Sequence, residues 1–418
     1  MSRGAGSLNP PRFGEIPLFD SGLGPQSGGA FGLIAPPRES QIIGLDRWQV
    51  EVAAGFPSVI ARGGTDTSYE DAFQASLLNA QRGLDLMSVD GANNLVVKGI
   101  DEDHLIWWLD GGELIIRAVS LAPINMDVPP VSVVVSDEHG KPIIQLPPPP
   151  PIWHESFRYF RLSQTSDDLF DAYRNAYLAL ESVLSGIAPQ TLNSQGKIAE
   201  GEAAWFRRAL AAADSLVPPV SFVPAGTSNP AQYFFDELFV DMRSAMSHAK
   251  SGRAILLPQS EAERRSVLAS LGRLVSLYLR LAEAHLRVRR VGGGMFAGGF
   301  RMLFSGSLNQ MAAWVSNDES SFTESTPPAL DPSTMRELDA IGEAESPRPF
   351  VLSRLWTAPA DRLSDLGFVR SVIGVHEEEA LSKAVLDGRL ELGPTARLEV
   401  ALGLRGSNTR LPKSRYLY

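Results

Sequence analysis

A run of five prolines, Pro147–Pro151, is the feature that most limits how this chain can fold. Proline has no amide hydrogen to donate and its ring fixes φ, so such a run neither continues a helix nor enters a sheet. We therefore expect a stiff, extended linker between one domain that ends near residue 146 and another that begins near residue 152. The alternative is a polyproline ligand for an SH3-type partner.

Length and composition narrow the classes of protein that remain. A chain of 418 residues is longer than one hydrophobic core usually serves, so we expect two or three domains. The absence of cysteine excludes disulfides, cysteine-based zinc sites and thiol nucleophiles. A formal net charge of −10 argues against a protein that binds nucleic acid over its whole surface. Without an apolar run of about 18 residues or a signal-peptide pattern, we expect a cytoplasmic protein with no membrane partner.

The patterning predicts a multidomain α+β fold. The expected order is an extended arm over 1–40, an α+β domain over 41–146, the proline linker over 147–151, a helical bundle over 152–290 and a β-containing region over 291–418. The arm is predicted from its abundance of Gly, Pro and Ser.

The α+β domain carries the clearest local signals of the first third. Residues 47–52 alternate like a strand, and residues 68–86 have helical spacing with Ser68 at the capping position. Asp110-Gly111-Gly112 separates two strand-like runs and predicts a hairpin. A second strand pair is expected around His139-Gly140.

In the last third, residues 300–305 after a glycine-rich run predict a strand. Residues 323–345 are polar and contain proline, which indicates a loop with one short helix. The alternation in 389–391 and 397–402 suggests a small closing sheet.

The middle third has four amphipathic segments. One apolar stripe runs from Leu169 to Ile187, and a second helix is expected from Glu202 to Leu216. A third begins near Pro230, a residue suited to the first helical turn. The fourth starts at Ser260 with a capping box, since Glu263 follows three positions later. Four such helices predict a bundle.

The third helix runs into an Arg-x4-His motif, Arg243 to His248. This spacing and its place between the third and fourth helices resemble the R-x4–6-H signature of HEPN domains. The stretch FRYFRLSQTSDDLFDAYRNAYLALE, 157–181, resembles the proteins labelled MauJ, of the methylamine-utilisation name. Together the resemblance covers residues 155–290.

The resemblance implies a metal-independent ribonuclease or RNA-binding protein of a bacterial defence or toxin system. It also implies a homodimer that places the motifs of two protomers across one cleft, and it implies no cofactor. Many active members carry Asn, His or Asp directly after the arginine, where this chain has Ser244.

The residue types suit that chemistry. Histidine titrates near neutral pH, so His248 can act as general acid and base, with Ser244 as a polar neighbour in the catalytic site. Arginine stays charged and presents a planar fork, so Arg243 can contact the phosphate. In an ideal helix five residues turn through about 500°, which leaves the two side chains about 140° apart. The motif therefore requires either a helix that ends before His248 or a second chain.

Substrate contacts are expected from Lys250, Arg253, Arg174 and Asp171. Between Asp241 and Arg290 ten Lys and Arg residues face four acids, a local balance of +6 that favours an electropositive patch. The alternative is a solvated helix face.

A structural interpretation of the motif stands beside the catalytic one. His248 could cap a helix C-terminus, and Arg243 could pair with a nearby acid. Asp171 and Arg174 could form an i, i+3 pair, with Glu181 as a surface acid. The protein would then be a non-catalytic dimerisation or interaction scaffold. The six histidines have no metal-ligand spacing, so no metal site is predicted.

Overall fold

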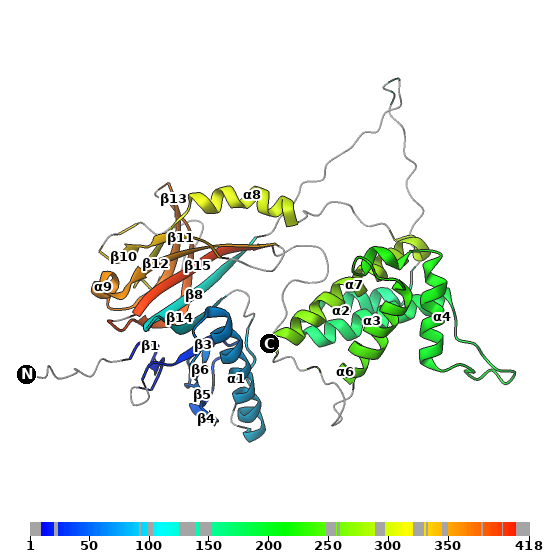
Figure 1. Cartoon of the computed structure of the whole chain (residues 1–418), viewed down its shortest axis with the longest axis horizontal. Helices are drawn as coiled ribbons and strands as arrows, with labels where there is room; N and C mark the ends of the chain where they lie inside the picture. The colour runs from blue at the N-terminus through cyan, green and yellow to red at the C-terminus, as the bar shows by residue number, and fades with distance from the viewer. Residues whose placement is uncertain are drawn as a thin grey trace, which may run out of the picture. The chain divides into compact units, whose positions relative to one another are not determined.

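A computed structural model describes residues 10–20, 24–91, 93–98, 103–124, 139, 141, 153–247, 256, 260–288, 297–320, 330–331, 333–344, 350–377, 379–394 and 396–406. They fall into two compact units (Figure 1). The β unit combines the described residues within 1–125 and 295–408, and the helical unit comprises those within 126–294. The proline linker and the strand pair expected around His139-Gly140 lie outside the described residues, apart from His139 itself.

One parallel strand pair joins the N-terminal and C-terminal parts of the β unit. Strand β8, Glu113–Ile124, pairs with β15, Ala396–Gly406, in a register that runs from Leu114 opposite Ala396 to Ile124 opposite Gly406. The prediction of separate N-terminal and C-terminal regions was therefore wrong: they form one unit, and the helical unit is an insertion between β8 and α8. Local patterns do not reveal such a pairing because its two strands lie far apart in sequence.

The larger sheet has nine strands among the described residues, in the order β11-β12-β15-β8-β7-β3-β6-β5-β4. Its remaining strands are β3 (Ser27–Gly32), β4 (Gln41–Leu45), β5 (Trp48–Val52), β6 (Ser58–Gly64), β7 (Asp103–Asp110), β11 (Asp339–Ala344) and β12 (Val351–Pro359). All its other neighbours pair antiparallel.

The smaller sheet has six strands among the described residues, in the order β10-β9-β13-β14-β1-β2. They are β1 (Arg12–Phe13), β2 (Ile16–Pro17), β9 (Ala312–Ser316), β10 (Met335–Glu337), β13 (Val369–His376) and β14 (Glu379–Glu391). Two short helical turns, α9 (Ala360–Leu363) and η3 (Ser364–Leu366), connect β12 to β13.

The larger sheet is covered on both faces, which explains its apolar strands. On one face helix α1, Tyr69–Asp90, packs over β3, β6, β5 and β4 (Figure 1). On the other face the two sheets share a second core. Two adjacent tryptophans lie on opposite faces of the larger sheet, because side chains alternate along a strand. Trp108 lies in the core with α1, and Trp107 lies in the core between the sheets.

Residues 10–40 do not form the expected arm. They supply β1, β2 and β3, and β3 is an internal strand whose six residues are all buried. Glycine-rich sequence usually indicates a loose segment, but the glycines of β3 permit close packing. A Cβ on Gly28 would lie 2.4 Å from both the Ala61 carbonyl oxygen and the Trp107 ring.

The predicted helix and hairpin of the first third are confirmed. Ser68 caps α1, where its Oγ accepts a hydrogen bond from the Asp71 amide at 3.2 Å. In the β7–β8 hairpin Asp110 pairs with Glu113, and Gly111 and Gly112 both have positive φ. Such φ values fit a tight turn between twisted strands.

Three predictions for the last third were wrong. Residues 300–305 belong to a helix, α8 (Ala297–Gln310), because Phe300, Phe304 and Leu308 recur every four residues and pack toward β12. The predicted loop over 323–345 contains strands β10 and β11. The predicted small closing sheet does not form either, since β14 belongs to the smaller sheet and β15 to the larger one.

The helical unit contains α2 (Ser156–Thr165), α3 (Leu169–Ile187), α4 (Glu202–Asp214), η1 (Pro219–Phe222), α5 (Pro230–Phe234), η2 (Phe235–Arg243), α6 (Ser244–Ser247) and α7 (Glu261–Leu286). One hydrophobic core connects these helices. No described helix of either unit is long and apolar enough to cross a membrane.

The four predicted helix starts are confirmed. Asp168 caps α3; α4 begins at Glu202; Pro230 is the first residue of α5; and Ser260 accepts a hydrogen bond from the amide of Glu263 at the start of α7. Helix α2 was not predicted as a separate element. Whether these helices constitute a HEPN-type four-helix bundle stays a prediction.

An excision tests the insertion. Replacing residues 126–294 with a flexible Gly/Ser linker should leave a chain that unfolds cooperatively with a β-rich circular dichroism spectrum, because the hydrophobic cores of the β unit lie outside the insertion. The matched control also lacks residues 396–406. It should fail to fold, since β12 and β8 lose the strand between them. Loss of cooperative unfolding in the first chain would contradict the two-unit description.

Candidate functional site

The described part of the Arg-x4-His motif lies where a π-helix changes into an α-helix. Arg243 is the last residue of η2, a π-helix, and Ser244 begins α6. π-Helical turns are rare and often occur at functional sites. Because η2 is not an α-helix, the angle expected for an ideal helix does not apply to Arg243. His248, Lys250 and Arg253 lie outside the described residues.

Three helices place an aromatic side chain and a charged side chain one turn apart. The aromatic layer is Tyr177 of α3, Phe206 of α4 and Phe239 of η2, and the charged layer is Glu181, Glu202 and Arg243 of the same helices. Phe206 lies 5.6 Å from both other rings, measured between centroids. In α3 and α4 the aromatic and charged residues lie four positions apart and therefore on one helix face. The Arg243 guanidinium lies near the Phe239 ring of η2, so packing the aromatic layer brings the three charges together.

Arg243 joins the two layers. Its Nη2 donates to Glu202 Oε1 at 2.6 Å, and its guanidinium carbon lies 4.9 Å from the centroid of the Phe239 ring. The Tyr177 ring is 5.9 Å away. The Arg243 side chain is 36% exposed and that of Glu202 is 43% exposed. An ion pair as exposed as this one contributes about 1 kcal/mol or less.

Of the two carboxyl groups in the charged layer, Glu202 pairs with Arg243, and Glu181 is hydrogen-bonded to Glu202. Burial raises the pKa of Glu181, the charge of Glu202 raises it further, and Arg243 opposes both effects. Burial also raises the pKa of Tyr177 above its ordinary range, so its hydroxyl stays neutral. That hydroxyl is buried and has no hydrogen-bond partner among the described residues.

Two of the predicted substrate residues, Asp171 and Arg174, pair with each other. Asp171 and Arg174 form an i, i+3 ion pair of 2.9 Å, and both are more than half exposed. The structural interpretation of Asp171 and Arg174, an i, i+3 ion pair, therefore holds for these two residues. Ser244 is half-buried beside Arg243. Glu181, in contrast, is not a simple surface acid, because it is half-buried and faces Glu202.

A cleft of about 610 Å³ opens beside the charged layer. Four glutamates line it: Glu155, Glu181, Glu200 and Glu202. None of its described lining residues is Lys or Arg. Tyr159, Trp205 and Ile198 contribute apolar surface. The described His, Asp and Glu residues, these four glutamates included, form no group that could hold a metal ion.

Sequence reasoning missed Glu202, Tyr177 and Phe206. The available signal was the repeated i, i+4 spacing of an aromatic and a charged residue in three segments. Spacing within each segment was visible, but nothing in the sequence indicated that the three pairs would face one another.

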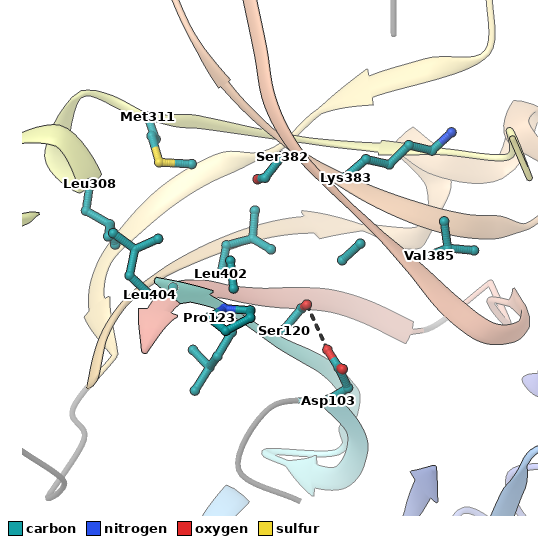
Figure 2. Close-up of a pocket in the computed structure, with 14 residues that line it drawn as sticks. Asp103, Ser120, Pro123, Leu308, Met311, Ser382, Lys383, Val385, Leu402 and Leu404 are labelled. Atoms are coloured by element: carbon teal, nitrogen blue, oxygen red, sulfur yellow. Dashed lines mark hydrogen bonds between the residues drawn. The ribbon is translucent and has the colours of Figure 1, made fainter. Parts of the chain in front are cut away.

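The β unit has its own pocket, of about 290 Å³, between the two sheets and α8 (Figure 2). Its walls are largely apolar and include Leu308, Met311 and Leu402. Ser120 Oγ donates to Asp103 at 2.8 Å at one side. The Lys383 ammonium instead bonds Asp318 at 2.6 Å, and its side chain is 1% exposed. Because these polar groups satisfy one another, this pocket is a weaker candidate for a reactive site.

Comparison with protein-family models, with curated proteins and with solved structures finds no match to this chain. The comparisons therefore show no HEPN or MauJ resemblance, and both stay predictions from the Arg-x4-His motif, its helical context and the stretch 157–181.

A pH-dependent stability follows from Glu181. A carboxyl group whose pKa is raised by folding stabilises the folded state most below its ordinary pKa of 4.5, and this contribution is lost as pH rises through the raised value. Glu181→Gln stays neutral, so its urea midpoint should match that of the wild type near pH 4 and exceed it at pH 7. Equal midpoints at both pH values would contradict the raised pKa.

The aromatic layer is expected to dominate the stability of the helical unit. Phe206 is fully buried, so Phe206→Ala should lower the free energy of unfolding by about 3–5 kcal/mol. Val220→Ala is the control, because a residue that is 60% exposed should change it by less than about 0.5 kcal/mol. Urea unfolding followed by helical circular dichroism measures both. A small effect of Phe206→Ala would show that the layer contributes little.

Proposed function

We propose that this chain is a non-enzymatic binding protein in which the β unit carries an inserted helical binding unit. The observation that supports it best is the charge arrangement around Arg243. The arginine already has a carboxylate partner, and the adjacent cleft is lined by four glutamates. A negatively charged cleft repels phosphate and favours cationic groups.

The expected electropositive patch gains little support from the described residues. Several of its arginines are engaged by acids: Arg265 by Glu261, Arg273 by Glu237 and Arg280 by Glu283. Arg264 is 2% exposed. Their charges are therefore largely compensated or buried, which leaves less positive potential to attract a polyanion.

The second candidate is a HEPN-type metal-independent ribonuclease or RNA-binding protein of a bacterial defence or toxin system. It is favoured by the π-helix that ends at Arg243 and by the modest strength of the Arg243–Glu202 pair, which a phosphate with two acceptor oxygens could replace. His248 would then move protons, and Lys250 and Arg253 would contact the substrate. A homodimer is proposed for both candidates, and a cytoplasmic location remains a proposal.

One assay separates the two candidates. Full-length protein is incubated with labelled RNA in EDTA, together with Arg243→Ala, His248→Ala and Glu202→Gln variants. The binding-protein proposal expects no cleavage by any of them. The ribonuclease proposal predicts that the wild type cleaves RNA and that Arg243→Ala and His248→Ala abolish the cleavage. It also predicts that Glu202→Gln increases the cleavage, because this change frees Arg243. Cleavage with this pattern would refute the first proposal, and its absence would refute a ribonuclease.

A further inference from the structure

The larger sheet ends at β4, an edge strand that lacks the usual protection (Figure 1). An edge strand exposes unpaired backbone groups, which natural sheets shield with charges, proline or a bulge. At the opposite edge, β11 has Asp339, Glu343 and an irregular register. In the smaller sheet, β10 has two charged residues among its three, and β2 is two residues long and ends at Pro17. The five residues of β4, QIIGL, include no charge, proline or bulge. Among the described edges, β4 is therefore the most open to another strand.

Local contacts hold β4 in an ordered conformation. A two-residue turn, Asp46-Arg47, joins it to β5, and Asp46 has a positive φ of 50°. Before the strand, the buried Asn93 side chain accepts a hydrogen bond from the Arg38 amide and donates one to the Glu39 carbonyl, both at 3.2 Å. Because both ends of β4 are anchored within the single chain, pairing with another strand costs little additional conformational entropy.

The open side of β4 presents the backbone groups of Ile42 and Gly44. Leu45 lies opposite Trp48 and closes the turn, so the hydrogen bonds to β5 fall on alternate residues counted back from Leu45. The N–H and C=O groups of Ile42 and Gly44 therefore point away from β5, where no described strand pairs with them. The Ile42 side chain is 55% exposed, and a Cβ on Gly44 would meet no atom within 4 Å. This edge therefore offers hydrogen-bonding groups beside an exposed apolar side chain.

The edge complements itself when two copies are related by a two-fold axis. With the axis at Ile43, the two strands run antiparallel, and Ile42 of each copy lies opposite Gly44 of the other. Each such pair would exchange both backbone hydrogen bonds, and Ile42 would cover the space that the glycine leaves open. The two Ile43 side chains would meet on the α1 face of the sheet, where Ile43 already packs against the core beneath α1.

The charges beyond the two ends of β4 fit the same register. It places Glu39 of one copy beside Arg47 of the other, because these residues lie four positions on either side of Ile43. Both residues are exposed, and neither forms an ion pair within the described part of the chain. Opposite charges therefore meet at both ends of the antiparallel pairing, whereas a parallel, in-register pairing would bring like charges together.

We propose that two copies of this chain associate through their β4 strands, so that the larger sheets of two β units join into one continuous sheet. The partner is a second copy because the edge matches its own two-fold image in shape, hydrogen bonding and charge. The inference rests on the homodimer proposed above and gives its interface, in the β unit instead of at the Arg243 motif. It is independent of whether the chain binds a ligand or cleaves RNA. The short strand makes the contact small, and a small interface is typical of a weak, reversible dimer.

The test is sedimentation equilibrium of the full chain from about 1 to about 500 µM, the range in which weak dimers form and dissociate. The wild-type mass should rise with concentration and stop at that of a dimer, because pairing uses up the edge. Ile42→Lys adds a charge to the edge and Gly44→Pro removes an N–H donor, so each should weaken association about tenfold or more. Both positions are exposed, so the circular dichroism spectrum should not change. Ile341→Lys is the matched control: Ile341 is 52% exposed on β11, at the opposite edge, and its replacement should change the affinity less than about twofold.

A charge exchange tests the register of the pairing. Glu39→Arg and Arg47→Glu should each weaken association about threefold or more, since each change places like charges together at both ends of the pairing. The double variant restores opposite charges, so its affinity should return to within about twofold of the wild-type value. Restoration is specific to an antiparallel pairing of two copies, because in no other arrangement of β4 do these two residues meet at both ends.

Three results would overturn the interface. They are a monomer mass at every concentration, a dimer that Ile42→Lys and Gly44→Pro leave intact, and a double charge variant that associates no better than the single variants. Equal weakening by Ile341→Lys would also overturn it, in favour of non-specific association. Failure here leaves the non-enzymatic proposal intact, because that proposal is tested separately by RNA cleavage.

Discussion

The parallel pairing of β8 with β15 is the interaction on which the architecture depends. It is the only parallel pair among the described strands, and it connects the N-terminal half of the larger sheet to β12 and β11. A parallel pair requires the chain to leave the sheet and return. Here the excursion includes the whole helical unit. Strands on both sides of this pair contribute to the core that the larger sheet shares with the smaller one.

A second dependence operates inside the helical unit. The aromatic layer of Tyr177, Phe206 and Phe239 fixes the rotation of three helices, and this rotation determines which charges meet one turn away. Hydrophobic packing therefore places Glu181 and Glu202 together despite their mutual repulsion. The raised pKa of Glu181 is the electrostatic consequence. The packing of the aromatic layer also explains why the neighbourhood of Arg243 is acidic although the surrounding sequence is rich in arginine.

Features set by a few neighbouring residues were predictable. Ser68 and Ser260 cap helices, Pro230 starts one, and Gly111-Gly112 turns a hairpin, because each depends on contacts within about four residues. Predictions failed where a distant partner decided the outcome. Residues 27–32 became a buried strand through β6 and β7, and residues 335–344 became strands through β9 and β12. The site was predictable only as the position of Arg243, since Glu202 lies on another helix.

The sequence by itself determined the chemistry that is available: a chain without cysteine, with an arginine, a serine and a histidine at motif spacing and with amphipathic helices to carry them. Only the tertiary structure decided the surroundings of that arginine. Its carboxylate partner comes from a residue 41 positions away, and the rings that it contacts are Tyr177 of another helix and Phe239 of its own. Electrostatic and packing environments depend on distance in space, which local sequence patterns do not encode.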